Sequence, residues 1–159
     1  MKRVVWLITS ILLLNTAWAG TLPYFSLTDM NGRQFRTSDY TNKQMMVITF
    51  WATWCSPCKQ LMTKLDKIRK EHPDLLVVAI SIDDSSTMVG VKPYIEGKKY
   101  DFAVLLDTDG KVIRMFDPLK NVPITLVVDK AGNIIYSLTG YLPGDEKEIR
   151  KKLLEGGLR

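Results

Sequence analysis

Residues 51–59 read Trp-Ala-Thr-Trp-Cys-Ser-Pro-Cys-Lys and contain both cysteines of the chain, Cys55 and Cys58. The residues that lead into this stretch, 45–52, form a short apolar run, as expected for a buried strand. The residues after it carry apolar side chains at helical spacing. A cysteine at the start of a helix faces unpaired N–H groups and the positive end of the helix dipole. Because both stabilise a thiolate over a thiol, we expect Cys55 to be a nucleophile.

Cys58 lies one turn into the expected helix, close enough to Cys55 to form a disulfide and shielded by the turn above it. We therefore expect Cys58 to be the resolving thiol. A purely structural bridge across two residues would remove little entropy from the unfolded chain. Two cysteines and one histidine do not supply four soft ligands for a structural zinc ion, so no metal site is expected.

Outward from this stretch, the pattern predicts alternating strands and helices. Residues 75–82 and 124–129 are Val- and Ile-rich runs, typical of strands that are covered on both faces. A strand, a helix and a strand in this order indicate a right-handed unit with parallel strands. Two hairpins are also expected. Their strands are residues 24–27 with 34–36, around Asn31-Gly32, and residues 124–129 with 134–139; residues 103–107 form a further strand.

Three further helices are expected. Residues 84–100 contain Pro93 and predict a helix that is short or kinked, with Ser85 and Ser86 as cap candidates. Residues 111–116 predict a short helix. The last helix is expected to start at Asp145, with Glu148 completing a capping box, and to end at Gly156-Gly157.

Length and composition indicate one packed domain. The chain has 159 residues, 46% hydrophobic and 25% charged, which excludes a disordered chain and a polytopic membrane protein. The net charge of +5 is spread along the chain without a basic block, so no nucleic-acid partner is expected.

The first nineteen residues have the pattern of a secretory signal peptide. Lys2 and Arg3 precede an apolar run over residues 4–14, and Ala17-Trp18-Ala19 is a small-x-small cleavage pattern. The apolar run is much shorter than the roughly 20 residues that span a bilayer. We expect residues 1–19 to be removed near Ala19/Gly20, and residues 20–159 to form a periplasmic domain without stable membrane insertion.

The stretch 51–59 resembles the redox site of the thioredoxin superfamily, and more closely that of its exported TlpA/ResA-like disulfide reductases. The resemblance extends to residues 25–29 with Gly32, to residues 122–129 with Gly132, and to Gly140. It implies an α/β thioredoxin fold: a central mixed β-sheet flanked by helices, with an N-terminal β-hairpin and an inserted helix after Asp83.

The same resemblance assigns Pro123 to a cis-proline loop packed against the disulfide. A cis Val122-Pro123 bond would leave the backbone groups of Val122 free to pair with a substrate segment as an added strand. Trp54, next to the nucleophile, is interpreted as a shield of the disulfide and part of the docking surface, whereas Trp51 is interpreted as a core residue. The expected substrate-binding residues are Trp54, Ser56, Pro57, Val122 and Pro123.

Two positions depart from the family pattern. Thr49 stands where thioredoxins have a buried acid, and Leu61 stands where many cytochrome-maturation members carry a glutamate. A haem-pathway role is therefore not transferred to this chain. Asp83 and Asp84 follow a parallel strand at the same edge of the sheet as Cys55, and either is a possible proton relay for the resolving thiol. We favour the alternative that the pair caps the following helix.

These features predict an exported thiol-disulfide oxidoreductase that reduces disulfides in other exported proteins and needs no cofactor. A membrane thiol-reductant transporter is the expected electron donor. One alternative is a thiol peroxidase of the peroxiredoxin type, a class that shares the N-terminal segment and the inserted helix but lacks the tryptophan-flanked cysteine pair. Another is a non-catalytic copper carrier or assembly chaperone on the same fold, a class with wider cysteine spacing and a distant histidine ligand.

Overall fold

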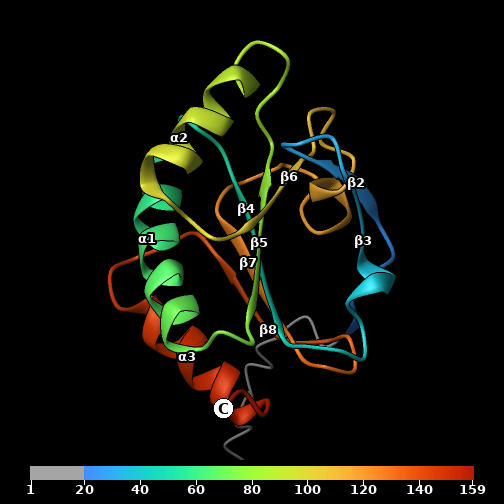
Figure 1. The fold of residues 1–159 in the computed structure, drawn as a ribbon, viewed down its shortest axis with the longest axis vertical. Helices are drawn as coiled ribbons and strands as arrows, with labels where there is room; N and C mark the ends of the chain where they lie inside the picture. Colours follow the sequence, from blue (N-terminus) through green and yellow to red (C-terminus); the bar gives the residue numbers. More distant parts are fainter. Residues whose placement is uncertain (1–19) are drawn as a thin grey trace, which may run out of the picture.

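A computed structural model describes residues 20–159, so the predicted signal peptide, residues 1–19, lies outside the described residues. One mixed sheet runs through the centre, with strand order β1-β8-β7-β4-β5-β6-β2-β3 (Figure 1). The β4–β5 and β5–β6 pairs are parallel and the other pairs are antiparallel. The strands are β1 Gly20–Thr21, β2 Ser26–Asp29, β3 Gln34–Arg36, β4 Met46–Trp51, β5 Leu76–Ser81, β6 Ala103–Leu106, β7 Ile124–Val128 and β8 Asn133–Thr139.

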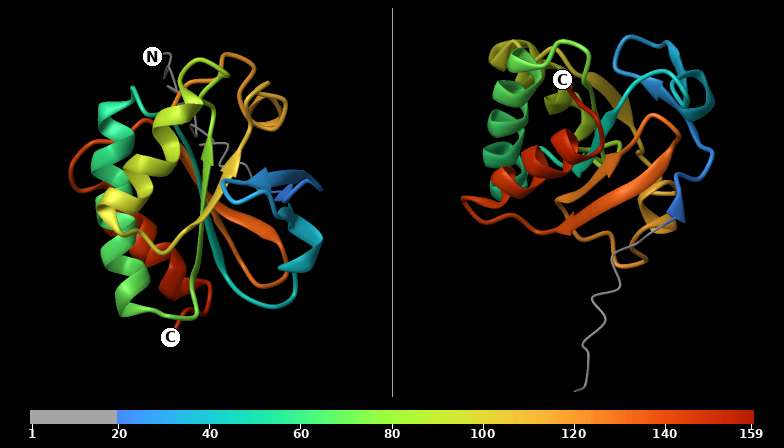
Figure 2. Two further views of the ribbon diagram at one scale, coloured as in Figure 1. Left: turned by 45° about the horizontal axis from the view of Figure 1, so that its top comes forward. Right: turned by 90° about the horizontal axis from the view of Figure 1, so that it is seen from below.

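Three α-helices lie on one face of the sheet, and the β2–β3 hairpin lies on the other side (Figures 1 and 2). The α-helices are α1 Ser56–Glu71, α2 Val91–Lys98 and α3 Asp145–Glu155. Three short 3-10 helices are η1 Thr37–Asp39, η2 Met88–Gly90 and η3 Ile113–Met115. This arrangement confirms the predicted thioredoxin fold, with its N-terminal hairpin and an inserted helix, α2, between β5 and β6.

The alternation of side chains along β4 explains why the sheet is covered on both faces. Every residue of β4 is buried. Met46, Ile48 and Phe50 point into the core beneath the hairpin and η3, whereas Val47 and Trp51 pack under the helices. A strand that is buried on both sides cannot alternate between polar and apolar residues, which accounts for its continuous apolar run.

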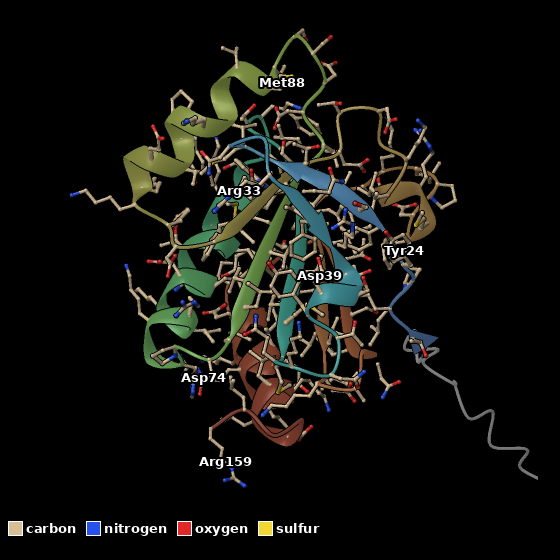
Figure 3. All side chains as sticks on the ribbon, turned by 45° about the vertical axis from the view of Figure 1, so that its right-hand side comes forward. Tyr24, Arg33, Asp39, Asp74, Met88 and Arg159 are labelled. Atoms are coloured by element: carbon tan, nitrogen blue, oxygen red, sulfur yellow. A yellow bond between two sulfur atoms is a disulfide. The ribbon has the colours of Figure 1, made fainter. Side chains whose placement is uncertain are left out.

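The carboxyl ends of β4 and β5 set the position of the cysteine pair. These strands are parallel, and Trp51 is level with Ser81. The backbone therefore leaves β4 and β5 at the same end of the sheet. This is the end of the molecule that carries Met88, and it lies opposite Arg159 (Figure 3). The loop from β4 to α1 and the loop from β5 to η2 lie next to each other, since the N–H of Thr53 donates to the carboxylate of Asp83 at 2.9 Å.

The start of α2 differs from the prediction. This helix begins at Val91, after Gly90, which makes no side-chain cap, so Ser85 and Ser86 are wrong as caps. Pro93 is the third residue of α2. Proline is tolerated there, because the N–H groups of a first helical turn have no intrahelical partner. With eight residues, α2 is short, as predicted.

The start of α3 is at Asp145, as predicted, but the capping box is wrong. The carboxylate of Asp145 accepts the N–H of Leu142 at 2.7 Å, and Glu146 accepts the N–H of Gly144 at 2.8 Å. Glu148 instead forms ion pairs with lysines one turn further along the helix. Carboxylates inside the first turn thus fix the preceding loop.

Two smaller features were not foreseen. Residues 111–116 contain a 3-10 turn, η3, rather than an α-helix, and its first N–H groups, from Val112 and Ile113, bind the buried carboxyl of Asp107. Burial raises the pKa of Asp107 above its usual value, and these bonds oppose that rise. The short strand β1 adds to the edge of β8.

Within residues 20–159, no helix has the length and apolar character needed to cross a membrane.

Candidate active site

Cys55 occupies the position just before the first residue of α1. Its N–H donates to the carbonyl of Ala52 at 3.0 Å, which turns the chain out of β4. Its Sγ accepts the N–H of Cys58 at 3.3 Å, so sulfur is the N-cap of the helix. Cys55 and Cys58 form a disulfide, with their Cα atoms 5.3 Å apart. The sulfur that caps α1 is therefore also one of the two sulfur atoms of the disulfide.

The positive end of the α1 helix dipole faces Cys55 Sγ and is not neutralised by the first turn of the helix. No acidic residue lies in that turn. Pro57 is its second residue and has no N–H to satisfy. Cys55 is 5% exposed and Cys58 is 1% exposed, so the first cysteine is the more accessible of the two. This geometry favours thiolate at Cys55.

The loop before β7 packs against the disulfide. The Val122-Pro123 peptide bond is cis, as the family resemblance implied. The carbonyl oxygen of Val122 lies 3.8 Å from Cys55 Sγ, and the side chain of Val122 contacts the core around the cysteines. The carbonyl of Pro123 accepts the N–H of Gly140 at 2.8 Å, which ties this loop to the loop before α3.

The two tryptophans of the motif have different environments. Trp51 is fully buried and packs against Tyr94 with ring centroids 5.4 Å apart, which confirms its place in the core. Burial raises the pKa of Tyr94 well above its usual value. Trp54 is 63% exposed, and Ser56 and Pro57 are exposed beside it. The cysteine pair thus lies beside a large apolar side chain that is open to solvent.

Asp83 and Asp84 have opposite environments, and neither caps α2, so that part of the capping interpretation is wrong. Asp84 is exposed, and its Oδ1 accepts the N–H groups of Ser86 and Thr87, which fixes the turn before η2. Asp83 is 1% exposed. Its carboxylate points back to the other loop, where it binds the residue two positions before Cys55, Thr53.

Three hydrogen bonds reach the carboxylate of Asp83. Oδ1 accepts the hydroxyl of Thr53 at 2.5 Å, and Oδ2 accepts the N–H of Thr53 at 2.9 Å. Oδ2 also accepts the hydroxyl of Ser81 at 2.7 Å. The sequence analysis missed this link between the two loops. The available signal was the parallel pairing of β4 and β5, because Thr53 and Asp83 each lie two residues beyond paired residues.

Neither of the two positions that depart from the family pattern, 49 and 61, holds an ionisable side chain. Thr49 and Thr125 are both buried and their hydroxyl groups are 3.1 Å apart, within hydrogen-bond distance. Leu61 is fully buried in the core between the sheet and the helices α1 and α3. Among residues 20–159, no group of three or more His, Cys, Asp and Glu side chains could hold a metal ion.

A family model and several known proteins match most of the chain. A family model described as the AhpC/TSA family matches residues 19–137. The chain is 27% identical over 132 residues to the thiol-disulfide oxidoreductase ResA of Bacillus thuringiensis subsp. konkukian, covering 82% of this chain and 75% of that protein.

Two solved structures have a similar fold. A putative thiol:disulfide interchange protein DsbE from Chlorobium tepidum has a TM-score of 0.77 at 23% identity, over 87% of this chain and 96% of that one. A thio-disulfide isomerase from Thermus thermophilus has a TM-score of 0.72 at 27% identity, over 89% of this chain and 97% of that one.

Proposed function

This chain belongs to the AhpC/TSA family, and we propose that it is an exported reductase of disulfides in other exported proteins. It is a thiol-disulfide oxidoreductase, similar to ResA, with a cysteine pair on a thioredoxin fold. The observation that carries the proposal is the position of Cys55, whose sulfur caps α1 and lies beside the carbonyl of Val122. Two sulfur atoms perform the reaction, and no cofactor is part of the proposal.

Catalysis begins from the reduced pair. The Cys55 thiolate attacks one sulfur of a substrate disulfide, forms a mixed disulfide, and releases the other substrate sulfur as a thiolate, which takes up a proton. Cys58 then loses its proton and attacks Cys55 Sγ. This step forms the Cys55–Cys58 disulfide and releases the second substrate thiol. Two electrons have passed to the substrate, and the enzyme needs a dithiol donor to start again.

Substrate docking is assigned to the residues around Cys55. Trp54, Ser56 and Pro57 are exposed on one side of it. On the other side, Val122 precedes β7, and its carbonyl oxygen contacts sulfur rather than a neighbouring strand. An extended substrate segment that pairs with the backbone of Val122 would bring its disulfide over Cys55. The buried Pro123 forms the floor of this position.

Export and the electron donor complete the proposal. The signal-peptide pattern of residues 1–19 supports export to the periplasm. That compartment is oxidising, so sustained reduction there requires electrons from inside the cell. A membrane thiol-reductant transporter would supply them by exchange with the Cys55–Cys58 disulfide. The proposed substrates are exported proteins that contain disulfides.

Trapping experiments in cells test the proposed direction. We expect Cys55 and Cys58 to be mainly reduced at steady state when thiols are alkylated in living cells. With Cys58→Ala, mixed disulfides with exported proteins should accumulate through Cys55, whereas Cys55→Ala should trap none. A pair that is mainly oxidised in cells would contradict the assignment as a reductant.

Two assays of the pure protein distinguish the alternatives. Rapid consumption of hydrogen peroxide by the reduced protein would support a peroxiredoxin-type peroxidase. Stoichiometric copper retention, together with no disulfide exchange, would support a copper carrier. We expect exchange with disulfides and neither of these results.

A further inference from the structure

A buried carboxylate lies beside the redox loop, and the reaction steps above do not use it. Asp83 is 1% exposed, and its three hydrogen-bond donors, from Thr53 and Ser81, are uncharged. In the part of the chain that the structure describes, residues 20–159, no lysine, arginine or histidine forms an ion pair with it. A side chain of this kind is costly to bury, so its position calls for an explanation.

We infer that Asp83 is a positioning residue that holds the Cys55 loop and, through its negative charge, biases the cysteine pair toward the disulfide. The inference rests on the proposed function, which it deepens by assigning a cause to the direction of electron transfer. It replaces the capping role expected for Asp83 from the sequence. Asp84, one residue further on, is exposed and has no such role.

The geometry places the charge close enough to act on Cys55. The Asp83 carboxylate binds the backbone and the hydroxyl of Thr53, and Cys55 follows two residues later. Consecutive Cα atoms are about 3.8 Å apart, so the carboxylate and Cys55 Sγ are on the order of 10 Å from each other. The charge is buried, and salt screens buried charges much less than exposed ones.

The sign of the effect follows from the charge of the thiolate. The negative charge of Asp83 opposes the thiolate that the start of α1 favours. A less stable thiolate means a less stable reduced form, so the equilibrium moves toward the disulfide and the protein gives up electrons more readily. The helix dipole makes Cys55 reactive, and Asp83 keeps the pair reducing.

Asp83→Asn removes the charge and keeps the shape, and Asp84→Asn is the matched control because it removes the same charge from an exposed neighbour. In the purified mature protein, we expect Asp83→Asn to lower the pH midpoint of Cys55 alkylation by about one unit, a tenfold change in acid dissociation. In equilibrium with glutathione above that midpoint, the reduction potential should become less negative by up to about 30 mV, the equivalent of tenfold. Asp84→Asn should change the midpoint by less than about 0.3 units.

Thr53→Val separates charge from geometry. This variant removes the hydroxyl that binds Asp83 but retains the carboxylate and the backbone N–H of residue 53. We expect its alkylation midpoint to stay close to that of the parent protein. A shift as large as that of Asp83→Asn would show that loop distortion, rather than charge, is responsible, and would overturn the inference.

A measurement on the unmodified protein covers the case in which Asp83→Asn does not fold. An electrostatic interaction between two groups acts on both of them. In the reduced protein, the carboxyl carbon NMR signal of Asp83 should therefore shift as pH rises through the alkylation midpoint of Cys55, and it should stay constant over that range in the oxidised protein. The same behaviour of this signal in both redox states would overturn the inference.

The variants also separate this inference from the proposed function. Midpoints and potentials are measured on the pure protein and do not depend on any substrate or donor. A shift confined to Asp83→Asn supports the inference even if the cysteine pair proves to be oxidised in cells. The absence of a shift, or an equal shift in Asp84→Asn, overturns it even if the pair proves to be reduced.

Discussion

The helices α1 and α3 each follow a segment that contacts residues 122–123, but their first turns are built in opposite ways. At the start of α3, Asp145, Glu146 and Glu148 lie in the first turn, and the first two accept N–H groups of the preceding loop. At the start of α1 no acid is present, and one sulfur accepts the N–H of Cys58.

The difference shows how one physical property of a helix serves two purposes. Carboxylates at the start of α3 neutralise the positive end of the dipole and hold the loop that reaches Pro123 through Gly140. The start of α1 keeps its positive potential for Cys55, where it stabilises a thiolate. On the proposed function, the first turn of α3 is a structural anchor, whereas the first turn of α1 serves the reactive cysteine.

Cys55→Ser has the largest expected effect, because it leaves an oxygen cap at the start of α1 and removes the sulfur of the proposed nucleophile. We expect disulfide-exchange turnover to fall to the background rate. Unfolding of the reduced protein should change by no more than about 1 kcal/mol, since serine is a good N-cap residue. Chemical denaturation and a disulfide-reduction assay measure the two quantities. Residual turnover well above background would contradict the assignment of the nucleophile.

Glu146→Gln tests the anchor at the start of α3. Burial raises the pKa of Glu146, but hydrogen bonds from its own N–H, the Tyr141 hydroxyl and the Gly144 N–H outweigh it and lower the pKa to about 2. A lowered pKa stabilises the fold above the ordinary value of 4.5, and this contribution is lost as pH falls from about 4.5 to about 2.

We therefore expect Glu146→Gln to lower the free energy of unfolding by about 1–2 kcal/mol at pH 7 and to have little effect near pH 2. Denaturant titrations at both pH values measure the difference. Glu148→Gln is the control, because Glu148 lies in the same first turn and forms ion pairs with lysine side chains of the same helix. An equal loss at both pH values would show that charge is not involved.

Ser56→Glu gives α1 an acidic first turn like that of α3. Ser56 is exposed, so the new carboxylate needs no space in the core. It should oppose the thiolate and slow alkylation of Cys55 at pH 7 by about two- to fivefold, the effect of one charge at a helix end. Ser56→Gln has similar size without charge and should react like the parent protein. Equal rates for both variants would show that the potential at the start of α1 does not control Cys55.

Asp84→Asn has the smallest expected effect. The carboxylate of Asp84 is solvated and serves the turn at residues 84–87. We expect the rate at which Cys58 resolves a mixed disulfide to change by no more than about twofold, or roughly 0.4 kcal/mol. Stopped-flow measurement of mixed-disulfide resolution tests this. A fall of tenfold or more without a loss of thermal stability would identify Asp84 as the proton relay.

The parts of the fold that local patterns control were predictable. The largely apolar run 45–52 predicted a strand that is buried on both faces, and β4 lies within it. Asn31-Gly32 predicted the turn of the β2–β3 hairpin. The cis bond before Pro123 came from family resemblance, because nothing local distinguishes it from a trans bond.

The parts that depend on strand register were not predictable. The bond between Asp83 and Thr53 joins residues 30 positions apart, and it requires that Trp51 be level with Ser81. The choice of caps at α2 and α3 failed for a related reason. Several acidic and hydroxyl side chains near each helix start compete for the same N–H groups, and tertiary packing decides between them.

The relative reactivity of the two cysteines is the decisive measurement for the role of Cys55. In the reduced protein at neutral pH, alkylation followed by mass spectrometry should label Cys55 at least about ten times faster than Cys58, because Cys55 combines access with thiolate stabilisation. Equal rates, or faster labelling of Cys58, would contradict the account in which the sulfur at the start of α1 is the nucleophile.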